Sequence, residues 1–158
     1  MKLKWKRLEN QTGHEAGREL LAQLYAEEVG APMPPILTTA QGKPYFAQGD
    51  WHFSISHTDT HGFCALSRKN IGLDAEAMDR QIDHRIGVRY LSEAEQKSVR
   101  EADDQRVALL RLWVMKEAYA KLTGRGVGNW LKNTEFDLFD SRIQCIDGCF
   151  VAILEEEK

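Results

Sequence analysis

Cysteine is scarce in this 158-residue sequence, and the three that occur form no metal-binding pattern. Cys64, Cys145 and Cys149 contain no C-x-x-C pair and leave an odd thiol over. This indicates a reducing compartment and argues against a cysteine zinc site. Four histidines likewise lack the spacing of zinc ligands on one element: His52, His57, His61 and His84.

Long apolar runs are also missing. No stretch has the length of a membrane-spanning helix and no secretory segment is present, so we expect a cytoplasmic protein that does not act on membranes. The formal net charge of −3 argues against a nucleic-acid binder that works by neutralising phosphates.

The first half of the sequence predicts one helix followed by short strands. Thr12 and Glu15 have capping-box spacing, and the helix after them is expected to end at Gly30, before three prolines. Its predicted buried side consists of Ala16, Leu20, Leu21, Leu24 and Tyr25. Strands are expected at residues 36–39, 51–56, 63–66 and 71–76, with Trp51, Phe53 and Ile55 inward in the second.

The second half predicts two helices and three strands. Ser92 begins another capping box, and Asp104 stands at the start of a long helix that Gly124 ends. Strands are expected at residues 134–139, 142–146 and 149–154, with a two-residue turn between the last two.

The order of helix, strands, helices and strands predicts an α+β protein with two lobes around one cleft. We expect an N-terminal lobe at residues 1–70 and a C-terminal lobe at residues 71–158, joined in one compact unit.

Charged residues recur on one side of the predicted long helix. Glu117 and Lys121 lie one turn apart, on the side that also carries Trp113. By themselves they allow two interpretations, an ordinary surface ion pair or a functional carboxylate and ammonium.

Asp74 and Glu76 alternate along the predicted strand at 71–76, so their side chains project from one face. Gly72 lies on that face too, where we expect it to leave room for a bulky ligand. Adjacent carboxylates repel each other unless a cation lies between them, and such hard oxygen ligands suit magnesium. An exposed acidic strand face is the alternative.

Ser56 and His57 stand at the end of a predicted strand. Their hydroxyl and imidazole could donate hydrogen bonds to a phosphate, or His57 could be a surface-loop residue. No G-x-S-x-G motif surrounds Ser54 or Ser56, which argues against a serine hydrolase.

Together these stretches resemble the ordered motifs of the 4'-phosphopantetheinyl transferases. The matching segments are GKP at 42–44, FSISH at 53–57, IGLDAE at 71–76 and WVMKEAYAKLTG at 113–124. With Ser-His ahead of Asp-x-Glu, the order is similar to the two-lobed surfactin-type class. The resemblance implies a monomer of two similar α+β lobes, related by a pseudo-twofold axis, with coenzyme A between them.

The resemblance also implies a reaction. The 4'-phosphopantetheine arm of coenzyme A would move to a serine of an apo acyl or peptidyl carrier protein, with release of 3',5'-ADP. Asp74, Glu76 and Glu117 would hold Mg²⁺, or Mn²⁺ in its place. Glu117 would also act as the base, directly or through water, Lys121 would assist the leaving group and His57 would complete the catalytic set. The coenzyme A site would consist of Arg18, Lys43, Pro44, Ser56, His57, Asp74 and Lys121.

The N-terminal lobe is shorter than in two-lobed relatives and lacks their basic segment ahead of the first helix. Lys2, Lys4, Lys6 and Arg7 are candidates to replace it. Two other functions stay open: a coenzyme A or carrier-protein binding module without turnover, and a magnesium-dependent phosphoester hydrolase.

A surface for the carrier protein is expected near the cleft. Because carrier proteins are usually acidic, this surface should be basic and apolar. Residues 80–90 are the candidate, although an amphipathic helix packed on its own lobe is the alternative. The relevant side chains are Arg80, Arg85, Arg89, Ile82, Ile86, Val88 and Tyr90.

Overall fold

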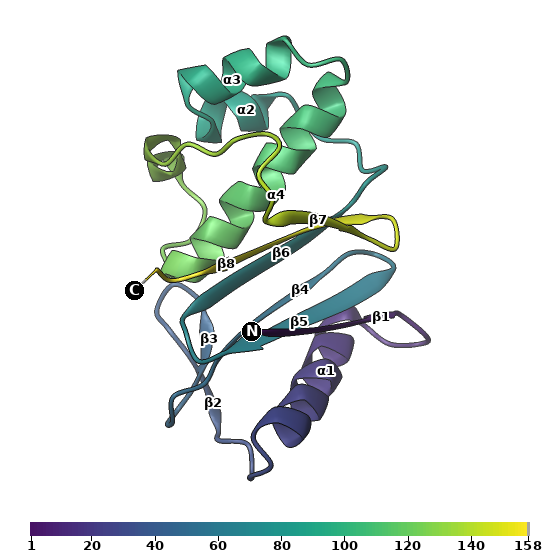
Figure 1. Ribbon diagram of the computed structural model, residues 1–158, viewed down its shortest axis with the longest axis vertical. Coiled ribbons are helices and arrows are strands. Elements are labelled where there is room, and N and C mark those ends of the chain that lie inside the picture. The colour runs from purple at the N-terminus through teal and green to yellow at the C-terminus, as the bar shows by residue number, and fades with distance from the viewer. Residues whose placement is uncertain (158) are drawn as a thin grey trace.

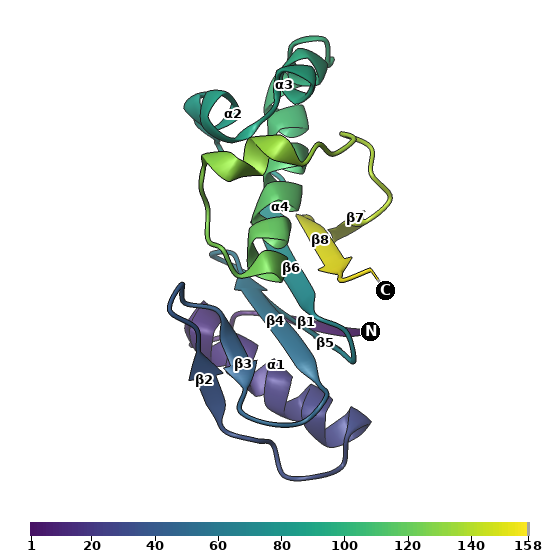
Figure 2. The same ribbon diagram turned by 90° about the vertical axis from the view of Figure 1, so that its left-hand side faces the viewer.

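Two three-stranded antiparallel sheets form the centre of the molecule, and a long helix covers the outer face of each (Figures 1 and 2). The structure is a computed structural model that describes residues 1–157, so residue 158 of the predicted C-terminal lobe lies outside the described residues. In chain order the elements are β1 (Lys2–Arg7), α1 (Gly13–Glu28), β2 (Ile36–Thr38), β3 (Pro44–Phe46), β4 (His52–His57), β5 (His61–Ser67), β6 (Ile71–Ala77), α2 (Arg85–Tyr90), α3 (Glu93–Arg100), α4 (Gln105–Thr123), the 3₁₀-helix η1 (Asn129–Asn133), β7 (Ile143–Ile146) and β8 (Cys149–Glu155).

Both sheets follow the same chain connectivity. In the first, α1 separates β1 from β4 and β5, and the strand order is β1-β5-β4. In the second, α4 separates β6 from β7 and β8, and the order is β6-β8-β7. The hairpin of β2 and β3 is added to the first lobe, whereas α2 and α3 are added to the second. The predicted α+β fold is therefore confirmed.

Helix α1 packs on the first sheet as its sequence pattern predicts. The Thr12 hydroxyl accepts a hydrogen bond from the Glu15 backbone amide at 3.1 Å, which satisfies a donor of the first turn. Gly17 allows the close approach of α1 to β4, because a Cβ there would lie 2.3 Å from Cγ2 of Ile55. All five residues predicted on its inner side are buried: Ala16, Leu20, Leu21, Leu24 and Tyr25.

Helix α4 is the central element of the second lobe. The Asp104 side chain accepts a hydrogen bond from the backbone amide of Val107, and Gly124 ends the helix with a left-handed φ of 73°. The face with Leu110 and Val114 is buried. Neither this helix nor any other within residues 1–157 is long and apolar enough to cross a membrane.

Serine side chains link the two sheets where β4 runs beside β6. Ser54 Oγ accepts a hydrogen bond from the Leu73 amide at 2.9 Å, and Ser56 Oγ accepts one from the Ala75 amide at 3.1 Å. The alternating pattern predicted a strand with only one covered face. Both serines are in fact buried, since their face of β4 forms the junction between the lobes.

Gly72 leaves room for α4 and not for a ligand. A Cβ at this position would lie 2.1 Å from the carbonyl oxygen of Ala118 and 2.4 Å from the backbone nitrogen of Leu122. The expectation that Gly72 makes space for a bulky ligand is therefore wrong. The missing side chain lets α4 lie directly on β6, which brings Glu117 close to the carboxylates of that strand.

Replacing Gly72 with alanine should destabilise the fold by about 3 kcal/mol, because the clash is with backbone atoms of α4 that cannot move independently. Denaturant unfolding measures the change. Gly87→Ala is the matched control: a Cβ there meets Leu109 Cδ1 at an ordinary 3.6 Å inside helix α2, so its stability should equal that of wild type or exceed it by up to about 1 kcal/mol. Equal stability of Gly72→Ala and wild type would contradict this packing.

Residues 134–139 do not form the predicted strand. They are an irregular segment whose backbone is held by buried side chains, since Lys116 Nζ donates to Thr134 O at 2.6 Å and Glu95 Oε2 accepts from the Phe136 amide at 2.8 Å. Their alternating apolar residues resembled a strand, but the partners are side chains from distant positions. The neighbouring prediction is confirmed: Asp147 and Gly148, at φ 46° and 80°, form the hairpin turn between β7 and β8.

Candidate active site

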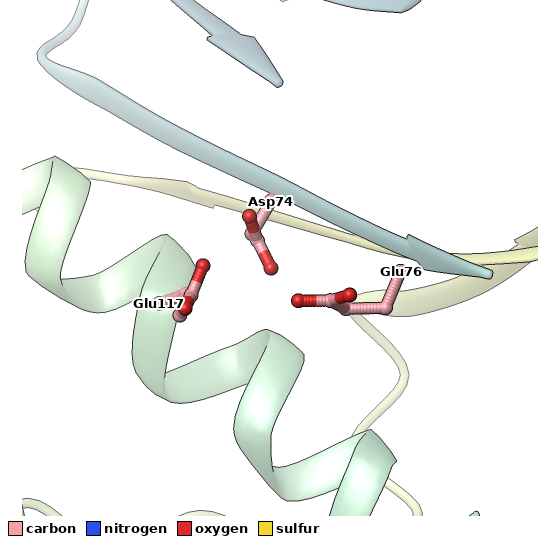
Figure 3. Close-up of side chains that lie close together, drawn as sticks. All are labelled: Asp74, Glu76 and Glu117. Carbon is pink, nitrogen blue, oxygen red and sulfur yellow. The ribbon is translucent and has the colours of Figure 1, made fainter. Parts of the chain in front are cut away.

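Three carboxylates meet between β6 and α4 (Figure 3). Asp74 and Glu76 come from alternate positions of β6, and Glu117 projects toward them from α4. One oxygen of each carboxylate lies within 4.8 Å of the other two. Asp74 is buried and the other two are half-buried, so this is not an exposed acidic strand face.

Two cations flank the cluster. Lys121 Nζ lies 3.2 Å from Asp74 Oδ1 and also donates to the carbonyl oxygen of Ile55 at 3.3 Å. Arg80 binds Glu76 Oε1 at 2.7 Å. Within residues 1–157 the ion-pair partner of Lys121 is therefore Asp74 on the facing strand, and the ordinary helical pair of Lys121 with Glu117 is not formed.

Glu117 is difficult to ionise in this setting. Burial, together with the negative charges of Asp74 and Glu76, raises the pKa of Glu117 to about 8, and Lys121 offsets only part of this. The pKa of Glu76 is raised as well, first by burial and then by Asp74, while Arg80 opposes the change. Near neutral pH, Glu117 therefore keeps a proton unless a further cation enters the cluster.

The cluster has the properties of a divalent cation site. Asp74 Oδ2 is buried and has no hydrogen-bond partner among residues 1–157, although buried carboxylate oxygens normally have one. Three carboxylates supply hard oxygen ligands of the kind that Mg²⁺ and Mn²⁺ prefer. The residues present thus fit such a cation.

A cavity of about 240 Å³ opens beside Glu117, between the two lobes. Its walls come from the turn before β3, from β4, from the last turn of α4 and from the glycine-rich loop that follows. Three predicted coenzyme residues line it: Lys43, Pro44 and Lys121. The other lining residues are Gln41, Gly42, Phe53, Ser54, Ile55, Glu117, Ala120, Gly124, Gly126 and Val127.

The other four predicted coenzyme residues do not line that cavity: Arg18, Ser56, His57 and Asp74. Ser56 is buried, and its hydroxyl donates to Asp74 Oδ1 at 3.1 Å, so it positions a carboxylate. His57 is exposed and packs over the first turn of α1, where a Cβ on Gly13 would lie 2.2 Å from its Cγ. Arg18 is half-buried on the same helix.

A second, wider hollow of about 880 Å³ is lined by Glu76 and Arg80. His57 at the end of β4 and His61 at the start of β5 also line it. Glu117 lines the first cavity and Glu76 lines this hollow. The carboxylate cluster can therefore be reached from two openings.

The basic N-terminal residues are paired away from the cavity. Lys2, Lys4 and Lys6 form ion pairs with glutamates of α1, and Arg7 binds Asp147 at 2.7 Å. Their strand, β1, lies at the opposite edge of the sheet from β4. These contacts give no support to the four residues as candidates to replace the basic segment of the two-lobed relatives.

Two polar contacts at the site were missed by sequence reasoning. Arg80 follows Glu76 by four residues, but that spacing indicates a pair only on a helix, and this segment is a turn. Asn70 accepts a hydrogen bond from Lys43 Nζ at 2.6 Å. No local signal could reveal that bond, because it joins residues 27 positions apart.

The raised pKa of Glu117 predicts a pH dependence of stability in the metal-free protein. The folded state holds the Glu117 proton more tightly than the unfolded state, where the pKa is about 4.3. This stabilisation is complete below the unfolded pKa and is lost as the pH rises through about 8. The melting temperature of EDTA-treated wild type minus that of Glu117→Gln should fall between pH 5.5 and 8.5; a constant difference would contradict the raised pKa.

The fold and the site together define a class. A carboxylate trio that fits a divalent cation, beside a cavity lined by two lysines, is suited to the chemistry of phosphate esters. Residues 70–152 match the family model of the 4'-phosphopantetheinyl transferase superfamily, and the chain belongs to this superfamily.

Named relatives agree with this family. The chain is 32% identical over 122 residues to the 4'-phosphopantetheinyl transferase psf-1 of Bacillus pumilus. The aligned region covers 74% of this chain and 52% of the relative. It is 34% identical over 114 residues to the 4'-phosphopantetheinyl transferase gsp of Aneurinibacillus migulanus, covering 69% and 47%. It is 29% identical over 143 residues to the human L-aminoadipate-semialdehyde dehydrogenase-phosphopantetheinyl transferase, covering 78% and 46%. The chain thus spans about half the length of the curated relatives it matches.

Proposed function

We propose that this protein transfers 4'-phosphopantetheine from coenzyme A to a serine of an apo acyl or peptidyl carrier protein and releases 3',5'-ADP. The observation that carries the proposal is the meeting of Asp74, Glu76 and Glu117 beside a cavity lined by Lys121. Relatives named as 4'-phosphopantetheinyl transferases support the same reaction.

The residues at the cluster account for the proposed chemistry. The serine oxygen forms a bond to the β-phosphorus of coenzyme A, and the bond from that phosphorus to the bridging oxygen of 3',5'-ADP breaks. Glu117 accepts the serine proton, directly or through water, a transfer that typically contributes about 10²–10⁴-fold. Lys121, held 3.2 Å from Asp74, neutralises the pyrophosphate and the departing 3',5'-ADP.

Asp74, Glu76 and Glu117 would hold Mg²⁺, or Mn²⁺ in its place, and the bound cation would supply positive charge to the pyrophosphate. Because protonated Glu117 cannot serve as a base, its carboxyl must lose the proton that the metal-free cluster retains. The same residue thereby serves both as ligand and as base.

The coenzyme site is proposed to begin in the cavity beside Glu117. The aliphatic stem of Lys43 and the ring of Pro44 offer an apolar wall there. His57 packs over the first turn of α1, and Arg18 belongs to that helix. Neither lines the cavity, and in the proposal they bind parts of the coenzyme that extend past it.

The carrier protein is proposed to approach through the wider hollow that Glu76 and Arg80 line. Within the candidate segment, Arg85 is already bound to Asp83 by hydrogen bonds of 2.9 and 2.6 Å. Val88 is 63% exposed on α2 and Arg89 is exposed beside it, so these two side chains fit an acidic partner with apolar contacts better than Arg85 does.

Charge reversal at Arg89 should raise the KM for the carrier protein and leave the KM for coenzyme A unchanged.

We further propose that the protein works as a cytoplasmic monomer, without nucleic acid or membrane. The presence of both lobes in one chain and of three free cysteines supports this.

Chromatographic detection of 3',5'-ADP tests the proposed function against its alternatives. Transfer predicts release that requires coenzyme A, Mg²⁺ and an apo carrier protein together. Steady release without a carrier protein would indicate the hydrolase alternative, with water in place of serine at the pyrophosphate of coenzyme A. Coenzyme binding without release, for several carrier proteins, would indicate a binding module that has lost turnover.

A further inference from the structure

The Lys43 ammonium is already engaged by two parts of the protein. Its Nζ donates to Asn70 Oδ1 at 2.6 Å and to the carbonyl oxygen of Leu122 at 2.9 Å. Asn70 Nδ2 donates to the same carbonyl at 2.8 Å. Lys43, Asn70 and Leu122 thus form a closed set of hydrogen bonds, which we call the latch.

The latch joins three segments that the chain connects only at long range. Lys43 belongs to the turn before β3, Asn70 to the segment that links the two sheets, and Leu122 to the last turn of α4. In both views the turn before β3 lies next to the C-terminal end of α4 (Figures 1 and 2). The latch therefore spans the two lobes at the cavity beside Glu117.

Both ends of the latch are fixed. The turn that carries Lys43 is closed by hydrogen bonds to Thr39: the Lys43 amide donates to Thr39 Oγ1 at 3.0 Å and the Thr39 amide donates to Lys43 O at 2.9 Å. At the other end, the Leu122 carbonyl is one of those that the helix itself leaves without a donor, since α4 ends at Thr123. A cation there also lies favourably at the negative end of the helix dipole.

We infer that Lys43 is a positioning residue, which sets the width of the coenzyme cavity by holding the end of α4 through Asn70 and Leu122. The residue before Leu122 is Lys121, and Glu117 lies about one turn earlier, so movement of this helix end displaces both functional side chains. Asn70 is absent from the cavity lining, so it affects the coenzyme only indirectly; besides its latch contacts, its Oδ1 accepts a hydrogen bond from the Ile71 amide at 3.1 Å. The expected effect on coenzyme A binding rests on the proposed function, whereas the hydrogen bonds of the latch do not.

Two substitutions separate the latch from direct coenzyme binding. Lys43→Met keeps the aliphatic stem that lines the cavity and removes the ammonium, whereas Asn70→Ala breaks the latch from outside the cavity. If the latch acts as inferred, amide hydrogen exchange at residues 121–126 should rise roughly tenfold in either variant. Each should also weaken coenzyme A binding by roughly fivefold, measured by calorimetry with Mg²⁺, and the double variant should be no weaker than either single one.

Arg7→Gln is the matched control, because it breaks another contact between the lobes, to Asp147, far from the cavity. Its hydrogen exchange at residues 121–126 and its coenzyme A affinity should equal those of wild type. Weaker coenzyme binding in Lys43→Met alone, with Asn70→Ala unchanged in both readouts, would overturn the inference and make Lys43 a direct coenzyme ligand. Increased exchange in a protein that binds no coenzyme A would support the latch while contradicting the proposed function.

Discussion

Glu117→Gln is expected to lower the rate of carrier-protein modification by about 10²–10⁴-fold, the usual contribution of a general base. The amide keeps the size of the side chain but cannot accept the serine proton, and it is a poorer ligand for a divalent cation. The rate of holo carrier protein formation, measured at saturating coenzyme A, tests this expectation.

The fold of Glu117→Gln should stay intact. At neutral pH the metal-free wild type must take up a proton on Glu117 when it folds, a cost that glutamine avoids, so the melting temperature of the metal-free variant should equal or exceed that of wild type. Lys97→Gln, which breaks an exposed ion pair between α3 and Glu101 at its C-cap, is a control expected to leave the rate unchanged. Near-full activity of Glu117→Gln would contradict the assignment of Glu117 as base and ligand.

Lys116→Met is expected to destabilise the folded protein by about 3–5 kcal/mol, the cost of leaving the partner of a buried ion pair uncompensated. Lys116 has 0% exposure, and its three N–H donors are all used: Leu131 O at 2.7 Å, Thr134 O at 2.6 Å and Glu95 Oε1 at 2.7 Å. Burial lowers the pKa of Lys116, and Glu95 opposes that change. The ammonium therefore holds α3 and the segment after η1 against α4.

Denaturant unfolding measures this effect, and a second variant identifies its cause. If the loss comes mainly from the charge left on Glu95, the double variant Glu95→Leu, Lys116→Met should recover part of the stability. The recovery stays partial because the carbonyls of Leu131 and Thr134 still lack donors, and the amides of Ser92 and Phe136 lose their acceptor. A loss below 1 kcal/mol for Lys116→Met would contradict the importance of the network.

Helices α1, α3 and α4 and their caps could be predicted well from the sequence because their signals are local, whereas α2 at Arg85–Tyr90 was considered only as an alternative. Thr12, Ser92, Asp104 and Gly124 each act on backbone groups within four residues, and all four occupy the predicted caps. The hairpin turn at residues 147–148 was predictable for the same reason.

The predictions that failed concern features that are set by contacts between residues distant in the sequence. Gly72 was expected to admit a ligand, and only the position of α4 shows that it admits a helix backbone. The strand predicted at 134–139 has the right alternation, but its backbone partners are side chains of Lys116 and Glu95. The second face of β4 is covered because Ser54 and Ser56 bind another strand.

The candidate site shows the same division. Alternation on a strand and helical spacing correctly placed Asp74 beside Glu76, and Glu117 beside Lys121, on single faces. That these two faces meet in one cluster is a tertiary fact, which the sequence indicated only through resemblance to a family. Whether Arg18 and His57 join the coenzyme site stays a prediction.

Intact-mass spectrometry of an apo acyl carrier protein, incubated with this protein, coenzyme A and Mg²⁺, tests the central claim most directly. We predict a mass gain of one phosphopantetheine group that disappears with EDTA and with Glu117→Gln. No mass gain with several acyl and peptidyl carrier proteins, from a folded protein that binds coenzyme A, would contradict the proposed transferase activity.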